Sequence, residues 1–473
     1  MDESIERIHD RAVRSSSHQS SIDWMRIDER LSWLERFGAA IDRHCDDLVA
    51  LIRDETGKCS WEALASEILP LRASIQWHLR HAPSVLASQR IPGKPWWLLG
   101  QSHRVVRVPV GRVAIIATWN YPVQLLGIQI VQSVIAGNTT VVKPSEHAPR
   151  SQGLLLRIAA QDIGAGALTR TAATRVAGER LLDSERFDHV IFTGSTEVGR
   201  SVARRAAETL TPTTLELSGC DSAFVLAGAD LSLAAKSIWQ AVVLNAGQTC
   251  MAPRRIIVES AVYRAFLAHL APLVAGAKPM RLISVAAAER MDACVQSAIA
   301  QGGHSLSGVA ESAVADRVRP IAVFDCPLTC DLAVGNHFSP AVAIVRAEDL
   351  TSASAIHCSY AKHLCVSVYA SRSQTNQLAA DCAFIAQLRA GSVTFNDSII
   401  PTAHPGASIS GTGESGWGST RGTAGLLALT RPVTVSRTNR WIRIPVGEPD
   451  PGAQRFLARI LGVPMSRKAW SKG

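Results

Sequence analysis

The sequence predicts an α/β fold with largely parallel sheets. Along most of the chain, short apolar runs alternate with helical segments, which is the order of elements in sheets whose parallel strands are connected by helices. The length of 473 residues exceeds the usual size of a single hydrophobic core, so we expect two or three domains. Hydrophobic residues make up 47% and charged residues 19%, a composition that excludes a chain disordered throughout.

The N-terminal region is predicted to be helical. Apolar residues recur at helical intervals over residues 22–52, Gly57 marks a stop, and a second helical stretch covers residues 60–85. Prolines and glycines between residues 90 and 109 then break helices, and the alternating run 104–110 predicts an exposed strand.

The alternation of strands and helices begins at Val113. We expect strands at 113–117, 140–142, 189–192, 223–226, 255–258, 341–345 and 366–369, and helices at 123–136, 152–161, 197–208, 231–243 and 263–275. Residues 113–142 carry no formal charge, yet Asn120, Pro122 and Asn138 favour a strand, a turn and a helix over a membrane span. The Gly-, Ser- and Thr-rich stretch 391–425 is predicted to be irregular and to line a site.

The net charge and the cysteine spacing exclude some classes of function. The net charge of +9 is a mild excess for this length, so it permits an anionic ligand such as a dinucleotide and gives no reason to expect nucleic acid. Cys326 and Cys330 are not followed by a second pair of ligands, so we expect neither a metal site nor a disulfide framework. The charged residues 1–14 contain no apolar stretch, so we expect no secretory signal. The polar residues within 113–142 lead us to expect no integral membrane segment, and the scattered cysteines indicate a reducing, cytoplasmic compartment.

Three side chains are candidates for chemistry. Cys250 follows Gly247, which allows close backbone approach; it is either a reactive thiol or a buried, inert one. Glu216 lies inside an apolar, strand-like run, where burial would raise its pKa and suit it to act as a general base. Asn120 follows a predicted buried strand and is either an amide donor in a site or a turn residue.

Two further segments are typical of nucleotide binding. Lys143 and Glu146 follow a predicted strand, where a carboxylate suits ribose hydroxyls. Residues 192–199 are predicted to form the end of a strand, a turn and the N-terminus of a helix. A helix N-terminus after such a turn is suited to bind a pyrophosphate. The segment does not have the G-x-G-x-x-G spacing of the common dinucleotide fingerprint.

Taken together and in order, these segments resemble the aldehyde dehydrogenase superfamily. They are Trp-Asn-Tyr-Pro at 119–122, Lys-Pro-Ser-Glu at 143–146, Phe-Thr-Gly-Ser-Thr-Glu-Val-Gly at 192–199, Leu-Glu-Leu-Ser-Gly at 215–219, Asn-Ala-Gly-Gln-Thr-Cys at 245–250, Phe-Asn-Asp at 395–397 and Gly-Thr-Gly-Glu-Ser-Gly-Trp-Gly at 411–418. The gap of 34 residues from Glu216 to Cys250 is also that of the family, and the resemblance covers residues 22–435. The short length and the run 185–192 look like the short, class 3-like branch.

The resemblance implies an NAD(P)-dependent oxidation of an aldehyde to a carboxylic acid. Cys250 would attack the aldehyde carbonyl, Asn120 and the Cys250 N–H would hold the oxyanion, and Glu216 would activate water to release the acid from a thioester. The cofactor is expected to be NAD, with NADP as an alternative. The expected cofactor-binding residues are Thr118, Trp119, Lys143, Glu146, Gly194, Ser195, Val198, Leu217, Asn336 and Phe338.

The same resemblance implies a domain organisation. A Rossmann-type cofactor domain would take residues 1–85 and 111–217, and an α/β catalytic domain residues 218–425. Residues 86–110 and 426–440 would form a small bridging β element that pairs between the subunits of a homodimer, and residues 441–473 a basic tail.

Two of the departures from the family pattern lie at predicted nicotinamide contacts. The family's Glu-Ile-Phe-Gly-Pro is Asn-His-Phe-Ser-Pro at 336–340, so Asn336 replaces a carboxylate that holds the nicotinamide ribose. Ser218 replaces a glycine beside the nicotinamide face. These departures leave open a catalytically weak dinucleotide-binding or scaffold protein, which the retained Cys250 and Glu216 oppose. A CoA-acylating relative is a further alternative, and Glu216 argues against it because such enzymes usually lack that base.

Overall fold

The computed structural model describes residues 26–98, 100–164, 166–308, 313–335, 337–438 and 451–462. Within these ranges they form two compact units, one of residues 26–86 and 108–431 and the other of residues 87–107, 432–438 and 451–462. Within the described ranges, no helix is both long enough and apolar enough to cross a membrane.

The larger unit begins with a layer of helices, as the sequence predicts. The predicted stretch 22–52 is divided at His44, and Gly57 ends the second helix in a left-handed conformation with a φ of 81°. The elements of this layer are α2 (Ile27–Arg43), α3 (Cys45–Thr56), α4 (Ser60–Ala63), a π-helical turn (Leu64–Ile68) and α5 (Leu69–Leu86).

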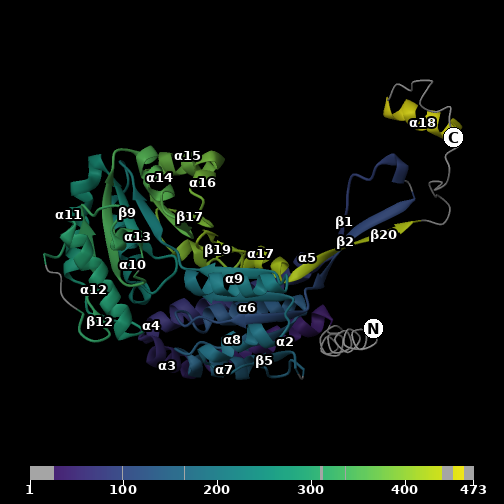
Figure 1. Cartoon of the computed structure of the whole chain (residues 1–473), viewed down its shortest axis with the longest axis horizontal. Coiled ribbons are helices and arrows are strands. Elements are labelled where there is room, and N and C mark those ends of the chain that lie inside the picture. Colours follow the sequence, from purple (N-terminus) through teal and green to yellow (C-terminus); the bar gives the residue numbers. More distant parts are fainter. Residues whose placement is uncertain are drawn as a thin grey trace. The chain divides into compact units, whose positions relative to one another are not determined.

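A six-stranded sheet of order β19-β7-β6-β3-β4-β5 follows, parallel except for β19. Its strands are β3 (Arg112–Ile116), β4 (Thr139–Lys143), β5 (Leu168–Arg170), β6 (His189–Gly194), β7 (Thr213–Leu217) and β19 (Gly416–Trp417). Alternate residues point to opposite faces, so that Val113 packs toward the N-terminal helices, and Ala114 toward the other side. The covering helices are α6 (Gln124–Ala136), α7 (Pro149–Ala159), α8 (Arg175–Ser184), α9 (Thr196–Glu208) and α17 (Gly422–Ala428), of which α17 lies next to α5 (Figure 1).

A seven-stranded sheet of order β11-β13-β14-β9-β8-β16-β17 forms the rest of the larger unit. Its strands are β8 (Asp221–Val225), β9 (Pro253–Glu259), β11 (His304–Ser305), β13 (Ile321–Phe324), β14 (Ala341–Ala347), β16 (Cys365–Tyr369) and β17 (Ser392–Phe395). Its helices are α10 (Leu231–Val243), α11 (Tyr263–Ala275), α12 (Val285–Ala300), α13 (Asp331–Val334), α14 (Leu350–Cys358), α15 (Arg372–Ala380) and α16 (Cys382–Gln387). Figure 1 shows α10 and α11 beside β9, whereas α12 contacts β12, β13 and α13.

Short elements complete the larger unit. They are the 3-10 turns Leu244–Gly247, Ser260–Val262 and Ile400–Ala403, and the paired strands β10 (Met280–Arg281) with β12 (Arg317–Val318) and β15 (Lys362–His363) with β18 (Thr412–Gly413). All the strands and helices predicted from Val113 onward are present, although their ends shift by a few residues. The stretch 391–425 is less irregular than predicted, because β17 and most of α17 lie in it.

The smaller unit contains a three-stranded sheet of order β1-β2-β20. Its elements are β1 (Gln89–Arg90), a 3-10 turn (Trp96–Leu98), β2 (Gln101–Pro109), β20 (Thr430–Thr438) and α18 (Pro451–Leu461), and the ends of β2 and β20 continue into the larger unit. The two segments that were predicted to form the bridging β element supply the strands of this sheet, and they pair with each other within this chain. Pairing between subunits stays a prediction. The division into cofactor and catalytic domains stays a prediction.

Candidate active site

Cys250 follows an unusual turn between α10 and β9. Asn245 and Ala246 each have a φ of 52°, and Gly247 has a φ of 70°. This left-handed conformation costs a residue other than glycine about 1 kcal/mol, so neighbouring contacts must hold it. The Asn245 N–H donates to Glu62 Oε1 at 2.5 Å, and its side-chain amide donates to the Asn120 carbonyl at 2.9 Å. The turn before the thiol is therefore fastened to a helix and to the Asn120 segment.

The environment of Cys250 keeps its thiol protonated in the free protein. Burial raises its pKa to about 12, and the carboxylates of Glu216 and Asp221 add to this effect, whereas the guanidinium of Arg421 opposes it. The thiolate is the nucleophilic form, so a reaction at neutral pH requires that its proton be removed.

Glu216 lies in β7, and its side chain is held by two hydroxyl groups. Its Oε1 accepts a hydrogen bond from Thr420 Oγ1, and its Oε2 accepts one from Thr193 Oγ1 at 3.3 Å. Burial raises the pKa of Glu216, while the Thr420 hydroxyl and the Arg421 guanidinium act in the opposite direction. A carboxylate with a raised pKa is suited to take a proton from water near neutral pH.

Asn120 follows β3 and is buried. Its side-chain amide donates to the carbonyl of Gln248 at 3.1 Å, and its side-chain oxygen accepts a hydrogen bond from the Thr118 hydroxyl at 3.0 Å. The hydrogen bond from Thr118 orients the Asn120 amide group. Because the side-chain oxygen faces Thr118, the NH₂ group points toward the turn that carries Cys250.

A cavity of about 700 Å³ brings most of the predicted site residues together. The predicted residues that line it are Thr118, Trp119, Asn120, Gly194, Ser195, Glu216, Leu217, Cys250 and Phe338. Ser218, one of the departures from the family pattern, also lines the cavity. The Trp119 and Phe338 rings meet edge to face with their centres 6.0 Å apart. The candidate catalytic groups and the candidate cofactor contacts therefore share one space.

Three predicted cofactor residues lie outside the lining of this cavity. Lys143 Nζ is paired with Glu146 Oε2 at 2.5 Å at the end of β4. Val198 is 48% exposed in the first turn of α9, where its N–H donates to the capping hydroxyl of Ser195. Asn336 lies outside the described residues.

The groups around this cavity fit a dinucleotide. At one end, Ser195 caps the N-terminus of α9, whose free N–H groups attract phosphate. Arg204, on the same helix, adds positive charge to the lining, whereas the charge of Arg200 is paired with that of Glu414. No cluster of three or more potential metal ligands occurs in the described ranges, and Cys326 Sγ lies 3.1 Å from Cys330 Sγ without further ligands around them.

Sequence reasoning missed several residues that support the site. Arg254, in β9, is buried, and its guanidinium donates to the carbonyls of Gly247 at 2.7 Å, Thr249 at 3.1 Å and Ser339 at 2.8 Å. An arginine at the start of a buried apolar strand was a visible signal. Lys58, which donates to Glu67 and to the Asn120 carbonyl, carries no such signal, because nothing near it in the sequence predicts these partners. Asn245 belongs to the motif at 245–250, but the motif does not predict its hydrogen bonds to Glu62 and Asn120.

Comparisons with known proteins agree with this geometry. The profile described as "Aldehyde dehydrogenase family" matches residues 2–435. The chain is 29% identical over 438 residues to the 4,4'-diapolycopene aldehyde oxidase of a Methylomonas species, covering 90% of this chain and 81% of that protein. It is 26% identical over 473 residues to the aldehyde dehydrogenase family 3 protein comG of Dictyostelium discoideum, covering 96% of each.

The fold is also that of solved structures. An aldehyde dehydrogenase of Mycobacterium tuberculosis, crystallised with NAD⁺, superposes with a TM-score of 0.81 at 24% identity, covering 89% of this chain and 88% of the other. The profile spans most of the sequence, so the chain belongs to the aldehyde dehydrogenase family and is an NAD(P)-dependent oxidoreductase that acts on aldehydes.

Proposed function

We propose that Cys250, Glu216 and Asn120 carry out the oxidation of an aldehyde to a carboxylic acid. The observation that supports this assignment most strongly is that the three side chains line one cavity although they come from three distant segments of the chain. A nucleophile, a base and an oxyanion donor around one space are the groups that acyl transfer through a thioester needs.

Each group has a distinct task. The Cys250 thiol gives up its proton to solvent water, and the resulting thiolate attacks the carbonyl carbon. The Asn120 amide together with the Cys250 N–H holds the oxyanion that forms. When bound, the dinucleotide would accept a hydride from the carbon atom that Cys250 has attacked. The loss of this hydride leaves a thioester on Cys250. Glu216 takes a proton from water, which attacks the thioester and releases the acid and the thiol. The buried position of Glu216 supports this task, because it raises the pKa of the carboxyl group.

We propose NAD as the preferred cofactor. Glu146 follows the strand whose end would bind the adenosine ribose, and a 2′-phosphate would meet its negative charge. Lys143 compensates part of that charge through the pair at 2.5 Å, so NADP is expected to bind less well rather than not at all.

We propose an apolar aldehyde as substrate. Trp119, Leu125, Phe338, Leu364 and Ile409 give the cavity around Cys250 apolar walls. The Methylomonas relative is named for 4,4'-diapolycopene aldehyde, which supports including polyene aldehydes among the candidates. Rates of NADH or NADPH formation with aliphatic, aromatic and polyene aldehydes, each with NAD and with NADP, test the proposal. We expect kcat/KM to rise with apolar chain length, and a preference for short polar aldehydes would contradict it.

We propose a homodimer that associates through the smaller unit. β20 is the longer of the two edge strands of its three-stranded sheet, and exposed backbone groups along an edge favour pairing with another chain. The molar mass in solution, measured by light scattering after gel filtration, tests this proposal.

A further inference from the structure

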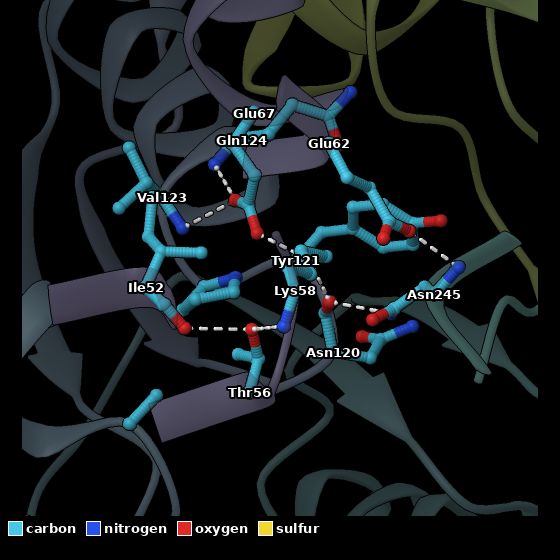
Figure 2. Close-up of polar contacts among 12 residues, drawn as sticks. Ile52, Thr56, Lys58, Glu62, Glu67, Asn120, Tyr121, Val123, Gln124 and Asn245 are labelled. Atoms are coloured by element: carbon cyan, nitrogen blue, oxygen red, sulfur yellow. Dashed lines mark hydrogen bonds and ion pairs between the residues drawn. The ribbon is translucent and has the colours of Figure 1, made fainter. Parts of the chain in front are cut away.

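Lys58 is a buried cation that the chemistry above does not use. It lies between α3 and α4, and neither its side chain nor that of Glu67 has exposed surface. Its Nζ donates to Glu67 Oε1 at 2.5 Å and to the Asn120 carbonyl at 2.6 Å, and it lies 4.1 Å from the centre of the Tyr121 ring (Figure 2). The ammonium group thus has a carboxylate, a carbonyl and an aromatic face as partners, as a fully buried charge requires.

Glu67 holds the other end of the same segment. Its Oε2 accepts hydrogen bonds from the N–H groups of Val123 and Gln124, both at 2.9 Å (Figure 2). These N–H groups lie at the start of α6 and have no partner within the helix. The ion pair of Lys58 and Glu67 therefore fixes the backbone at both ends of residues 120–124.

The Asn120 carbonyl also connects this segment to the turn that precedes Cys250. It accepts a second hydrogen bond from the Asn245 side-chain amide at 2.9 Å, so Lys58 and Asn245 bind the same oxygen atom. A displacement of this carbonyl would move the Asn120 side chain and loosen the nucleophile turn. Misplacement by about 1 Å can reduce a rate by about 100-fold.

A contribution to the stability of the fold does not by itself explain why Lys58 and Glu67 form a buried ion pair. Burying two charges costs desolvation energy, and replacing such a pair by uncharged groups is often neutral or stabilising. What the pair provides is a fixed geometry at three backbone atoms beside the site. We propose that Lys58 and Glu67 are positioning residues that hold the Asn120 amide where the substrate oxyanion forms, an inference that rests on the proposed role of Asn120.

A double-mutant cycle tests this proposal. Lys58→Met and the pair Lys58→Met/Glu67→Gln are made in the wild type and in Asn120→Ala, and single-turnover NADH formation is measured by stopped flow. The paired variant removes both charges, while the side-chain carbonyl of the introduced glutamine can still accept from the α6 N–H groups, so this variant is expected to fold even where Lys58→Met does not. Arg72→Met is the matched control, because it removes a 2.7 Å ion pair with Asp42 in the same helical layer without touching Asn120.

We expect both Lys58 variants to lower the single-turnover rate at least about tenfold in the wild type and less than about threefold in Asn120→Ala. The Kd for NADH should stay within about twofold, and Arg72→Met should lower Tm without changing the rate. Equal losses in both backgrounds, or no loss in either, would overturn the proposal. If the wild-type protein forms no NADH from any aldehyde, the proposed function fails instead.

Discussion

Gly247 packs against Ser339 so closely that a Cβ on Gly247 would lie 2.3 Å from the Ser339 carbonyl carbon. The turn that precedes Cys250 therefore touches the backbone that follows Phe338. Arg254 strengthens this contact, because its guanidinium donates to the carbonyls of both Gly247 and Ser339. The nucleophile and the aromatic wall of the cavity are thus held by one rigid junction.

Gly247→Ala should disrupt this junction. The methyl group has no space against the backbone, and a φ of 70° is unfavourable for alanine, so we expect a loss of about 2–4 kcal/mol in the free energy of unfolding. Single-turnover NADH formation should fall at least about tenfold. Gly302→Ala is the control, since Gly302 has a φ of 101° and no atom within 4 Å of the added Cβ. Urea unfolding of both variants measures the difference, and equal losses would contradict the packing argument.

The reactivity of Cys250 should depend steeply on pH in the free protein. Burial raises the pKa of its thiol to about 12, so the thiolate fraction should increase about tenfold for each pH unit between 7 and 10. The rate of iodoacetamide labelling of the Cys250 peptide, measured by mass spectrometry, should rise in the same way. Cys250→Ala identifies the peptide. A plateau below pH 8 would show that the thiol is already activated without ligands.

Glu146→Gln should shift the cofactor preference. It removes the charge that a 2′-phosphate would meet and leaves Lys143 without its partner at 2.5 Å. We expect the ratio of kcat/KM for NADP over NAD to rise about tenfold, which corresponds to about 1.4 kcal/mol. Arg175→Gln, which breaks the exposed pair with Glu179, is the control for loss of a nearby charge pair. An unchanged ratio would remove Glu146 from the cofactor contacts.

Much of the fold could be predicted because local patterns determine it. The apolar runs of β3, β6 and β14 and the helical periodicity of α9 and α11 are visible in the sequence and are confirmed. Strand order, and the short strands β5 and β19, could not be predicted, since pairing depends on segments far apart in the chain.

The candidate site was predictable only in part. Cys250, Glu216 and Asn120 belong to recognisable motifs, and the structure places them around one cavity. The supporting groups are different: Lys58 and Asn120 are 62 positions apart, and only the folded chain shows that they share a hydrogen bond. Arg254 stands out in the sequence as a charge in an apolar strand, but the sequence does not show which three backbone carbonyls accept its hydrogen bonds.

The covalent state of Cys250 in Glu216→Gln tests the central assignment most directly. Hydride transfer precedes hydrolysis, so this variant, mixed with aldehyde and NAD, should form about one NADH per site and then stall with the acyl group on Cys250. Mass spectrometry of the quenched protein should place the adduct on the Cys250 peptide, and Cys250→Ala/Glu216→Gln should carry none. A stalled variant without an adduct, or an adduct on another of the ten cysteines, would contradict the assignment.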